Sequence, residues 1–435
     1  MIQPLIVPLV VLLLGWFTAS PDHSRSSMVG GRVIDATTRA PLTDAIVTAG
    51  DREFRTDSAG RFSIDAAQCD VLGFRAHGYL RKLVVIESLR GADAQIALIP
   101  FRPRALYLSV YGAGSSKLRT AALALVETTE VNALVIDVKG DRGIIPYRSS
   151  VPMAAEVGAQ RIITIGDLPA LMTSLRARRV YTIARIVLFK DDLLVSARPR
   201  LGLRRPDGSL FRDREGLAWA NPYSPDVWRY NIDIAIEAAR AGFDEIQFDY
   251  ARLPDSTGVV YDRPWTQPNR EAPVEGFFKE ARRRLTPFNV FLAVDAFGYV
   301  CWNPGDTKIG QNLEHLSGIV DYVSPMLYPS SFQYGIPGYR KPVEHPYEII
   351  RLSLDQALRR TQLTPLHFRP WLQAFRDYAF GGRPFTAGEI RSQIKAAEDF
   401  GANGWMLWNP RNQYSAADLK PQTQSTDGPT EMSPR

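Results

Sequence analysis

The sequence predicts an α/β protein in which a (β/α)8 barrel, or TIM barrel, follows a small N-terminal β-sandwich. Three observations lead to this prediction. The chain has 435 residues, which is more than one hydrophobic core usually supports. Residues 28–100 contain short alternating strands separated by turn residues. From residue 105 onward, apolar strand-like runs alternate with amphipathic helical stretches in a repeating β-then-α order.

The chain begins with the apolar run MIQPLIVPLVVLLLGWF, which is typical of the hydrophobic region of a secretory signal peptide. No Lys or Arg precedes this run, so an uncleaved membrane anchor stays open as the alternative. We therefore assign residues 1–20 to a signal peptide or an N-terminal anchor. Either assignment predicts a protein that is secreted, periplasmic or part of the cell envelope, and the anchor would tether it to a membrane.

The second segment, residues 28–100, predicts the β-sandwich. The runs GRVID, AIVTAG, EFRTD, RFSID and VLGFRAHGY have strand-sized lengths and alternate between apolar and polar residues. Gly, Asp, Thr and Pro lie between them, as expected of tight turns. We find no combination of residues in this segment that is typical of a catalytic site.

The third segment, residues 105–412, predicts the barrel. Its eight expected strands are residues 105–112, 133–140, 181–189, 245–253, 290–298, 322–328, 369–375 and 404–409. Helical stretches lie between them, and one begins with Ser224 and Pro225, which are typical of a helix start. The alternative is a doubly wound open sheet, but that fold usually carries a Gly-rich phosphate turn after its first strand. The polar residues 413–435 predict a disordered tail.

Composition and motif searches exclude several function classes. The net charge of +6 is spread along the chain rather than gathered into a basic arm, so we expect no nucleic-acid partner. Two cysteines, Cys69 and Cys301, permit at most one disulfide, and the five histidines show no H-x-x-x-H spacing. No G-x-S-x-G motif is present. We therefore expect neither a metal site nor a cofactor.

The carboxyl ends of barrel strands meet at one face, where a site is expected. Asp137, Asp249 and Asp295 are the candidate catalytic residues there, and Lys139 ends a strand beside Asp137. The candidate substrate-binding residues are Arg185, Arg252, Tyr328, Trp371, Gln373, Trp408 and Asn409. Aromatic rings stack on sugars, amides and charges bind hydroxyl groups, and paired carboxylates cleave glycosidic bonds. This set predicts a polysaccharide or oligosaccharide substrate.

Two further regions complete the prediction. Residues 190–224 are too long for a plain connector and are expected to form a substrate-covering loop, with Trp219 and several arginines suited to a polysaccharide groove. Asp244 and Glu245 begin the strand that Asp249 ends. Because they lie at the opposite end of the barrel, we expect them to be solvated or to cap the preceding turn.

The stretch from ARIVLF to FDYARLP, residues 184–254, together with VDAFGY and DYVSPMLYPSSF, resembles the putative glycoside hydrolase domain family, a bacterial barrel group. The resemblance covers residues 105–410 and implies a TIM-barrel glycosidase. Residues 28–100 resemble a carboxypeptidase regulatory-like domain, through a pattern that includes Gly31, Val33, Asp35, Gly60 and Tyr79. That resemblance implies a spacer or surface-recognition module.

FDEIQFDY and SPMLYP also resemble the motifs of chitinase-like glycoside hydrolases, whose D-x-x-D-x-D-x-E pattern ends in the proton donor. Here Asp249 fits, but Gln247 and Ala251 replace an expected Asp and the catalytic Glu. Asp249 would then be the nucleophile or the carboxylate that stabilises the oxocarbenium ion, and Asp295, or alternatively Asp137, the general acid/base, with the exchange of these two roles as the alternative. A non-catalytic barrel that binds glycan at the cell surface is the alternative function.

Overall fold

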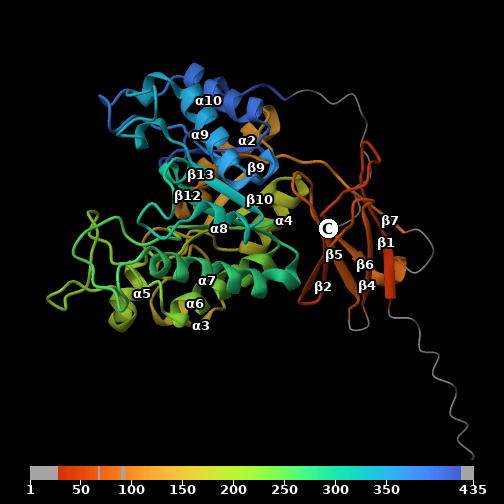
Figure 1. The fold of residues 1–435 in the computed structure, drawn as a ribbon, viewed down its shortest axis with the longest axis horizontal. Helices are drawn as coiled ribbons and strands as arrows, with labels where there is room; N and C mark the ends of the chain where they lie inside the picture. The colour runs from red at the N-terminus through yellow and green to blue at the C-terminus, as the bar shows by residue number, and fades with distance from the viewer. Residues whose placement is uncertain (1–27, 67–68, 90–93, 423–435) are drawn as a thin grey trace, which may run out of the picture.

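The computed structural model describes residues 28–66, 69–89 and 94–422 (Figure 1). The predicted signal peptide or anchor lies outside the described residues, as do residues 423–435 of the predicted tail. No helix in the described part of the chain is both long and apolar enough to cross a membrane.

Two small sheets form the N-terminal part. Strands β4 (Arg61–Asp65), β1 (Met28–Asp35) and β7 (Gln95–Leu98) form one sheet in this order, and β3 (Arg52–Arg55), β2 (Ile46–Ala49), β5 (Val71–Arg75) and β6 (Lys82–Val85) form the other, with the short helix η1 (Ile86–Leu89) beside them. In β4, Phe62 and Ile64 are buried while the alternate residues are exposed. They share one core with Val47 and Phe74 of the second sheet. The predicted two-residue period therefore places one face of each sheet inside.

Eight parallel strands close the predicted (β/α)8 barrel, which is confirmed. They are β8 (Arg104–Leu108), β9 (Ala133–Lys139), β10 (Tyr181–Val187), β11 (Glu245–Asp249), β12 (Phe291–Phe297), β13 (Tyr322–Met326), β14 (Trp371–Gln373) and β15 (Trp405–Trp408). All eight end earlier than predicted. β8 stops at Leu108 because the Ser109 side chain accepts a hydrogen bond from Gly112 N and so caps a helix there.

Helices cover the outside of the barrel. The α-helices are α1 (Val110–Gly114), α2 (Ser116–Thr128), α3 (Pro152–Glu156), α4 (Leu168–Ala177), α5 (Asp192–Ala197), α6 (Pro225–Ala241), α7 (Gln267–Leu285), α8 (Leu313–Ser317), α9 (Pro346–Thr361) and α10 (Ala387–Phe400). The 3-10 helices are η2 (Pro199–Leu201), η3 (Thr286–Phe288), η4 (Gly298–Cys301), η5 (Pro329–Ser331), η6 (Pro342–Glu344), η7 (Pro365–His367) and η8 (Ala416–Asp418). α6 begins at Pro225 as predicted and ends at Ala241, where Gly242 caps it with a φ of 99° that favours glycine.

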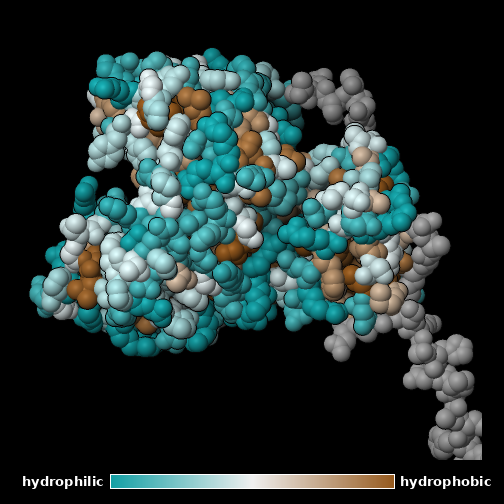
Figure 2. All heavy atoms as spheres, in the orientation of Figure 1, coloured by the Kyte–Doolittle hydropathy of each residue, from teal (hydrophilic) through white to brown (hydrophobic). Residues whose placement is uncertain are grey.

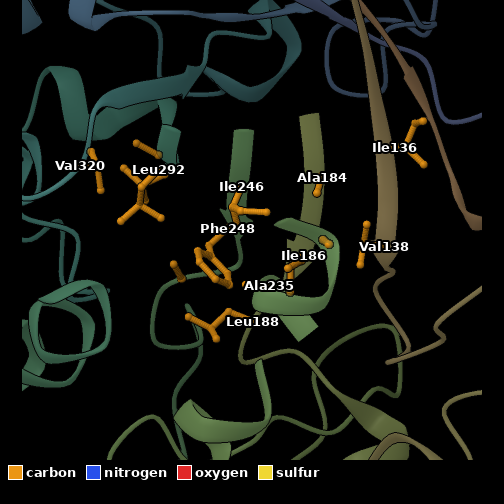
Figure 3. Packing of buried hydrophobic residues seen from close by; sticks show 14 of the residues in the cluster. Ile136, Val138, Ala184, Ile186, Leu188, Ala235, Ile246, Phe248, Leu292 and Val320 are labelled. Atoms are coloured by element: carbon orange, nitrogen blue, oxygen red, sulfur yellow. The ribbon is translucent and has the colours of Figure 1, made fainter. Parts of the chain in front are cut away.

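The alternation of side chains along the strands separates two cores. Ile246 and Phe248 of β11 face the helical layer, where Ala235 of α6 lies beside Ile186 (Figure 3). The alternate residues face the barrel interior, where apolar side chains such as Tyr322 form a separate core. Polar residues at inward positions therefore stand out against an apolar interior.

The N-terminal sheets pack on the end of the barrel where the strands begin, beside it in Figure 1. Asn289, two residues before β12, donates to the Phe74 and Lys82 carbonyl oxygens at 3.4 and 3.3 Å. Arg282 of α7 pairs with Glu53 at 3.1 Å. The opposite end of the barrel stays free of the sheets, and the surface is hollowed on that side (Figure 2).

Residues 413–422, which the sequence assigns to a disordered tail, pack against the barrel. The Tyr414 hydroxyl donates to the Tyr107 carbonyl oxygen at 2.9 Å and accepts from Tyr107 N at 3.1 Å. The packed structure thus extends beyond residue 412, because a buried tyrosine hydroxyl satisfies the backbone of β8.

Candidate active site

Strand β11 places a column of three polar side chains in the barrel interior. Glu245, Gln247 and Asp249 occupy alternate positions of this strand and are all buried. Asp249 ends the strand, and Tyr250 follows with a φ of 50°, an uncommon conformation for a residue other than glycine. Tyr250 N donates to Asp249 Oδ1 at 2.6 Å. The strained turn therefore fixes the Asp249 carboxylate at the mouth of the barrel.

Arg185 of β10 links the carboxylates at this end of the barrel. Its Nη1 lies 2.7 Å from Asp137 Oδ1, and its Nη2 lies 2.5 Å from Asp249 Oδ2 and 3.2 Å from Asp141 Oδ1. Burial alone would lower the pKa of Arg185, but Asp137 and Asp249 outweigh it and raise this pKa well above the usual value. Arg185 is therefore a permanent cation shared by three carboxylates.

Asp137 lies between Arg185 and the aromatic wall of the barrel. The Tyr107 hydroxyl donates to Asp137 Oδ2 at 2.7 Å, and the Tyr107 ring stacks on Trp408 with centroids 3.9 Å apart. Burial raises the pKa of Asp137 to about 6, although Arg185 opposes the shift. Asp137 is thus buried, with one oxygen bonded to Tyr107 and the other to Arg185.

Asp295 of β12 lies on the strand next to Asp249. Its Oδ1 accepts a hydrogen bond from Trp371 Nε1 at 2.7 Å, whereas its Oδ2 is buried and has no hydrogen-bond partner among the described residues. Burial, followed by the charge of Asp249, raises the pKa of Asp295 well above the usual value. Among the carboxyl groups of this cluster, Asp295 is therefore the one whose surroundings most strongly favour the protonated form.

A cavity of about 1260 Å³ opens above this cluster. Arg185 and Asp249 lie in its lining. Aromatic side chains form much of its wall: Phe297, Tyr299, Tyr328, Tyr334, Trp371, Phe375, Tyr378, Phe385 and Trp408. Tyr334 is 92% exposed and Tyr378 is 59% exposed. The cavity thus combines buried carboxyl groups with exposed rings on which sugars can stack.

The family model described as "Putative glycosyl hydrolase domain" matches residues 105–414, the whole of the barrel. The chain belongs to this family. No curated protein matches the sequence. The site described above is therefore the candidate active site of a putative glycosyl hydrolase domain.

Several solved structures are similar to this chain to different degrees. The PgaB (BpsB) glycoside hydrolase domain from Bordetella bronchiseptica is 16% identical, with 72% of this chain and 95% of that chain covered and a TM-score of 0.51. A hypothetical protein from Ruminiclostridium thermocellum is 33% identical over 44% of this chain and 96% of that chain, with a TM-score of 0.39. A chitinase from Chromobacterium violaceum is 12% identical over 72% and 98%, with a TM-score of 0.42.

Seven of the ten predicted site residues of the glycosyl hydrolase domain line the cavity: Asp249, Arg185, Arg252, Tyr328, Trp371, Trp408 and Asn409. Asp137 and Asp295 lie behind this lining, in contact with Arg185 and Trp371. The Asn409 amide is committed to the backbone, since Nδ2 donates to the Ala374 and Gln413 carbonyl oxygens.

The prediction that Gln373 binds substrate is not supported by its position. Gln373 is fully buried, its Oε1 accepts from Ser330 N at 3.0 Å, and its Nε2 donates to Ser330 Oγ at 2.7 Å. Both ends of the Gln373 amide are therefore hydrogen-bonded to Ser330, in the loop after β13. Gln373 thus stabilises the loop that carries Tyr328.

Lys139 does not reach the cavity either. The pairing of β9 with β10 shifts after Asp137, where Arg185 pairs with Asp137 and Ile186 with Lys139. This bulge turns Lys139 outward, where its ammonium lies 2.8 Å from Asp191 Oδ2 and 3.0 Å from Asn231 Oδ1. The sequence offers no signal for the extra residue.

The expectation that Asp244 and Glu245 are solvated is wrong. Glu245 is fully buried, and both of its oxygens accept from Arg369 Nη1, at 2.7 and 2.6 Å. Asp244 Oδ2 accepts from Thr182 N at 3.0 Å. The barrel interior and the docked sheets exclude water here, so each carboxylate is paired instead.

The loop over residues 190–224 contributes Arg214 to the cavity. Trp219, which the sequence suggested for a sugar groove, is only 2% exposed, and its Nε1 donates to Asp213 Oδ2 at 3.0 Å. Trp219 is therefore part of the loop's own core rather than a sugar platform.

The rule that sites lie at the ends of the strands missed several residues that line the cavity or contact its carboxyl groups. Asp141 lies two residues beyond β9, and Arg376 and Arg411 lie in loops after β14 and β15. Tyr107 occupies an inward position of β8, which the two-residue period could have identified. The loop residues carry no comparable periodic signal.

One group of side chains in the described ranges could hold a metal ion. Glu271 and Glu275 of α7 and His315 of α8 bring ligand atoms within 4.8 Å of one another. His315 Nδ1 lies 2.7 Å from Glu275 Oε1, so the three residues already form an ion-pair cluster when the histidine is protonated. None of them lines the cavity.

Proposed function

We propose that this protein is a glycoside hydrolase that cleaves glycosidic bonds in an extracellular or cell-envelope polysaccharide. One observation carries the proposal. On neighbouring strands below an aromatic cavity, Asp249 is paired with a buried arginine while the environment of Asp295 favours the protonated acid. Two carboxyl groups in unlike environments are what acid-assisted glycosidic cleavage requires.

The geometry favours one assignment of roles. Asp249 lies in the cavity lining, where its carboxylate can attack the anomeric carbon or stabilise an oxocarbenium ion. Asp295 holds the proton that the leaving oxygen needs, and it is hydrogen-bonded to Trp371, whose ring lines the cavity.

Tyr328 supports both steps. It lines the cavity, and burial, aided by the charge of Asp249, raises the pKa of its hydroxyl well above the usual value. The phenol therefore stays protonated and can donate a hydrogen bond to the sugar or to a reacting carboxylate.

A non-catalytic glycan-binding barrel is the second candidate. Ala251 stands where chitinase-like motifs carry the catalytic Glu, and Arg185 occupies Asp249 Oδ2 with two hydrogen bonds. These features favour recognition without cleavage.

The location of the protein is also a proposal. The apolar run at residues 1–17 supports export or membrane anchoring. The N-terminal sheets, which we propose to be a carboxypeptidase regulatory-like module, pack at the end of the barrel away from the cavity. A spacer in that position would leave the cavity free to meet a polymer.

The deciding experiment measures reducing-sugar release from bacterial and plant polysaccharides, acidic ones included, by the full chain. We expect the wild type to release sugar and Asp249→Asn to lose about 10⁴-fold in kcat. The matched control is Glu245→Gln, which also removes one arginine-paired carboxylate from β11, but at the other end of the barrel. We expect the folded control to keep the wild-type kcat.

Binding of a polysaccharide by the wild type without any release would replace this proposal with the glycan-binding alternative. Equal loss of kcat in both variants, at full folding by circular dichroism, would show that Asp249 has no special place in the reaction.

A further inference from the structure

We propose that the polysaccharide is anionic and that four arginines at the rim of the cavity bind its carboxylate or sulfate groups. This inference rests on the proposed function, because it names the substrate class of the same site. The rim arginines are Arg214, Arg252, Arg376 and Arg411, and all four line the cavity.

Charge is divided between the floor and the rim of the cavity. At the floor, Arg185 is surrounded by Asp137, Asp249 and Asp141, so the carboxyl groups outnumber the cation. At the rim, the four arginines face one further lining carboxylate, that of Asp255. The rim is therefore electropositive above a floor that is richer in acid.

None of the rim arginines forms an ion pair with a carboxylate of the described chain. Other exposed arginines of the same part of the protein do: Arg212, only two residues before Arg214, pairs with Asp192, and Arg200 and Arg229 pair with Asp226. Arg204 and Arg205 of the same loop also form no ion pair within the described residues, so what distinguishes the rim is the gathering of four such arginines around one cavity.

Arg252 shows how a rim cation is held in place without a carboxylate. Its guanidinium lies 5.2 Å from the ring centroids of both Trp219 and Tyr250, and Nη1 donates to the Leu253 carbonyl oxygen at 3.1 Å. Trp219 is itself fixed by Asp213. Two rings and one carbonyl orient the side chain, and its remaining N–H groups are free to bind an oxyanion.

The four arginines come from four different loops, those after β10, β11, β14 and β15. Exposed rings such as Tyr334 and Tyr378 lie on the same cavity. The cavity volume of about 1260 Å³ also exceeds the ~300–1,000 Å³ of a typical small-molecule site. A chain of sugars fits this arrangement, with the charged groups on units that flank the cleaved bond, because Asp249 would repel an anion at the floor.

The test measures binding by calorimetry with the full chain carrying Asp249→Asn, so that turnover does not consume the probe. The probes are a polygalacturonate oligosaccharide, its carboxyl-reduced neutral counterpart and a carrageenan oligosaccharide, a galactan that carries sulfate groups and no carboxylates. We expect at least one anionic probe to bind about tenfold or more tightly than the neutral one, and to weaken as NaCl rises from about 0.05 to 0.5 M. The two anionic probes distinguish carboxylate from sulfate recognition.

Adding Arg252→Gln should weaken anionic binding about tenfold, or about 1.4 kcal/mol. Arg252→Lys should recover part of the loss, because it keeps the charge but not the planar group. Arg229→Gln, an equal charge change on the exposed face of α6, should leave binding unchanged.

The outcomes separate this inference from the proposed function. Anionic binding without cleavage by the wild type supports the inference and overturns the hydrolase. Cleavage or binding of the neutral probe that equals or exceeds that of both anionic probes overturns the inference and leaves the hydrolase standing. Failure of both anionic probes to bind also overturns it.

Discussion

Strand β11 carries an arginine-paired carboxylate at each of its ends, and the two pairs differ in access. At the N-terminal end, Glu245 and Arg369 form an ion pair at 2.6 Å with no exposed surface on either side chain. At the C-terminal end, Asp249 shares Arg185 with two other carboxylates and lies in the lining of a large cavity. Burial and ion pairing are thus common to both ends, and only the cavity distinguishes a site from a structural pair.

The two pairs also differ in what completes them. Glu245 is enclosed by protein, since the Tyr181 hydroxyl donates to its Oε2 at 3.0 Å in addition to Arg369. Asp249 is completed by one backbone N–H and Arg185, and its remaining environment is the cavity. We infer that the first pair serves the fold and the second serves the proposed chemistry.

The largest effect is expected from breaking the structural pair. Arg369→Met leaves Glu245 buried without its cation, and we expect the free energy of unfolding to fall by about 3–5 kcal/mol. Urea denaturation measures this loss. The double variant Glu245→Met/Arg369→Met should recover most of it, because no charge remains buried.

The kcat of Arg369→Met tests the same contrast between the two ends of β11. At a temperature where Arg369→Met stays folded, its kcat should equal that of the wild type. A fall in kcat comparable to that of Asp249→Asn would show that the two ends of β11 do not divide their roles in this way.

The sequence predicts the pair at the C-terminal end of β11 but not the pair at its N-terminal end. Eight apolar runs with helices between them are sufficient for the barrel, and the rule that sites lie at strand ends then identifies Asp249 and Arg185. Glu245 and Arg369 are separated by 124 positions, and no local pattern connects them. Asp141, Arg376 and Arg411 come from loops, where conformation is set by tertiary packing and not by periodicity.

Gln373 shows a further limit. The sequence predicts a strand over residues 369–375, whereas β14 has only three residues and ends two residues earlier, at Gln373. Gln373 is therefore the last residue of the strand, and its side chain bonds to the next loop instead of reaching the cavity. Lys139 has a different cause, because the bulge adds one residue to β9 and one extra residue reverses every side chain after it.

The next effect is pH-dependent and concerns Asp137. Its pKa in the folded protein is about 6, above the unfolded value of 3.8, so the folded state binds more protons between these values. The free energy of unfolding of the wild type should fall by about 2 kcal/mol through this group as the pH rises from 4 to 7. Asp137→Asn removes this pH dependence. In urea denaturation, the free energy of unfolding of the variant should therefore gain on that of the wild type by the same amount between pH 4 and pH 7.

Asp321, at the barrel end that packs against the N-terminal sheets, is expected to show the opposite dependence of stability on pH. Burial raises its pKa, but Arg282 and Arg75 outweigh burial and lower it well below the usual value. Its charged form therefore stabilises the fold above pH 4, and this stability is lost as the pH falls. Asp321→Asn should accordingly be most harmful at neutral pH, and equal pH trends in the two variants would contradict the contrast between the ends.

The smallest effect is expected at the cavity rim. Tyr378 is 59% exposed, lines the cavity and stacks on Phe375 with an angle of 5° between the rings. Tyr378→Ala should raise KM about fivefold, or about 1 kcal/mol, with kcat unchanged, because a distal sugar contact stabilises ground state and transition state equally. Tyr111→Ala is the matched control, since Tyr111 is 54% exposed on α1 and does not line the cavity. If Tyr378→Ala instead lowers kcat as much as it raises KM, the ring orients the reacting sugar, and the rim then belongs functionally to the same unit as Asp249.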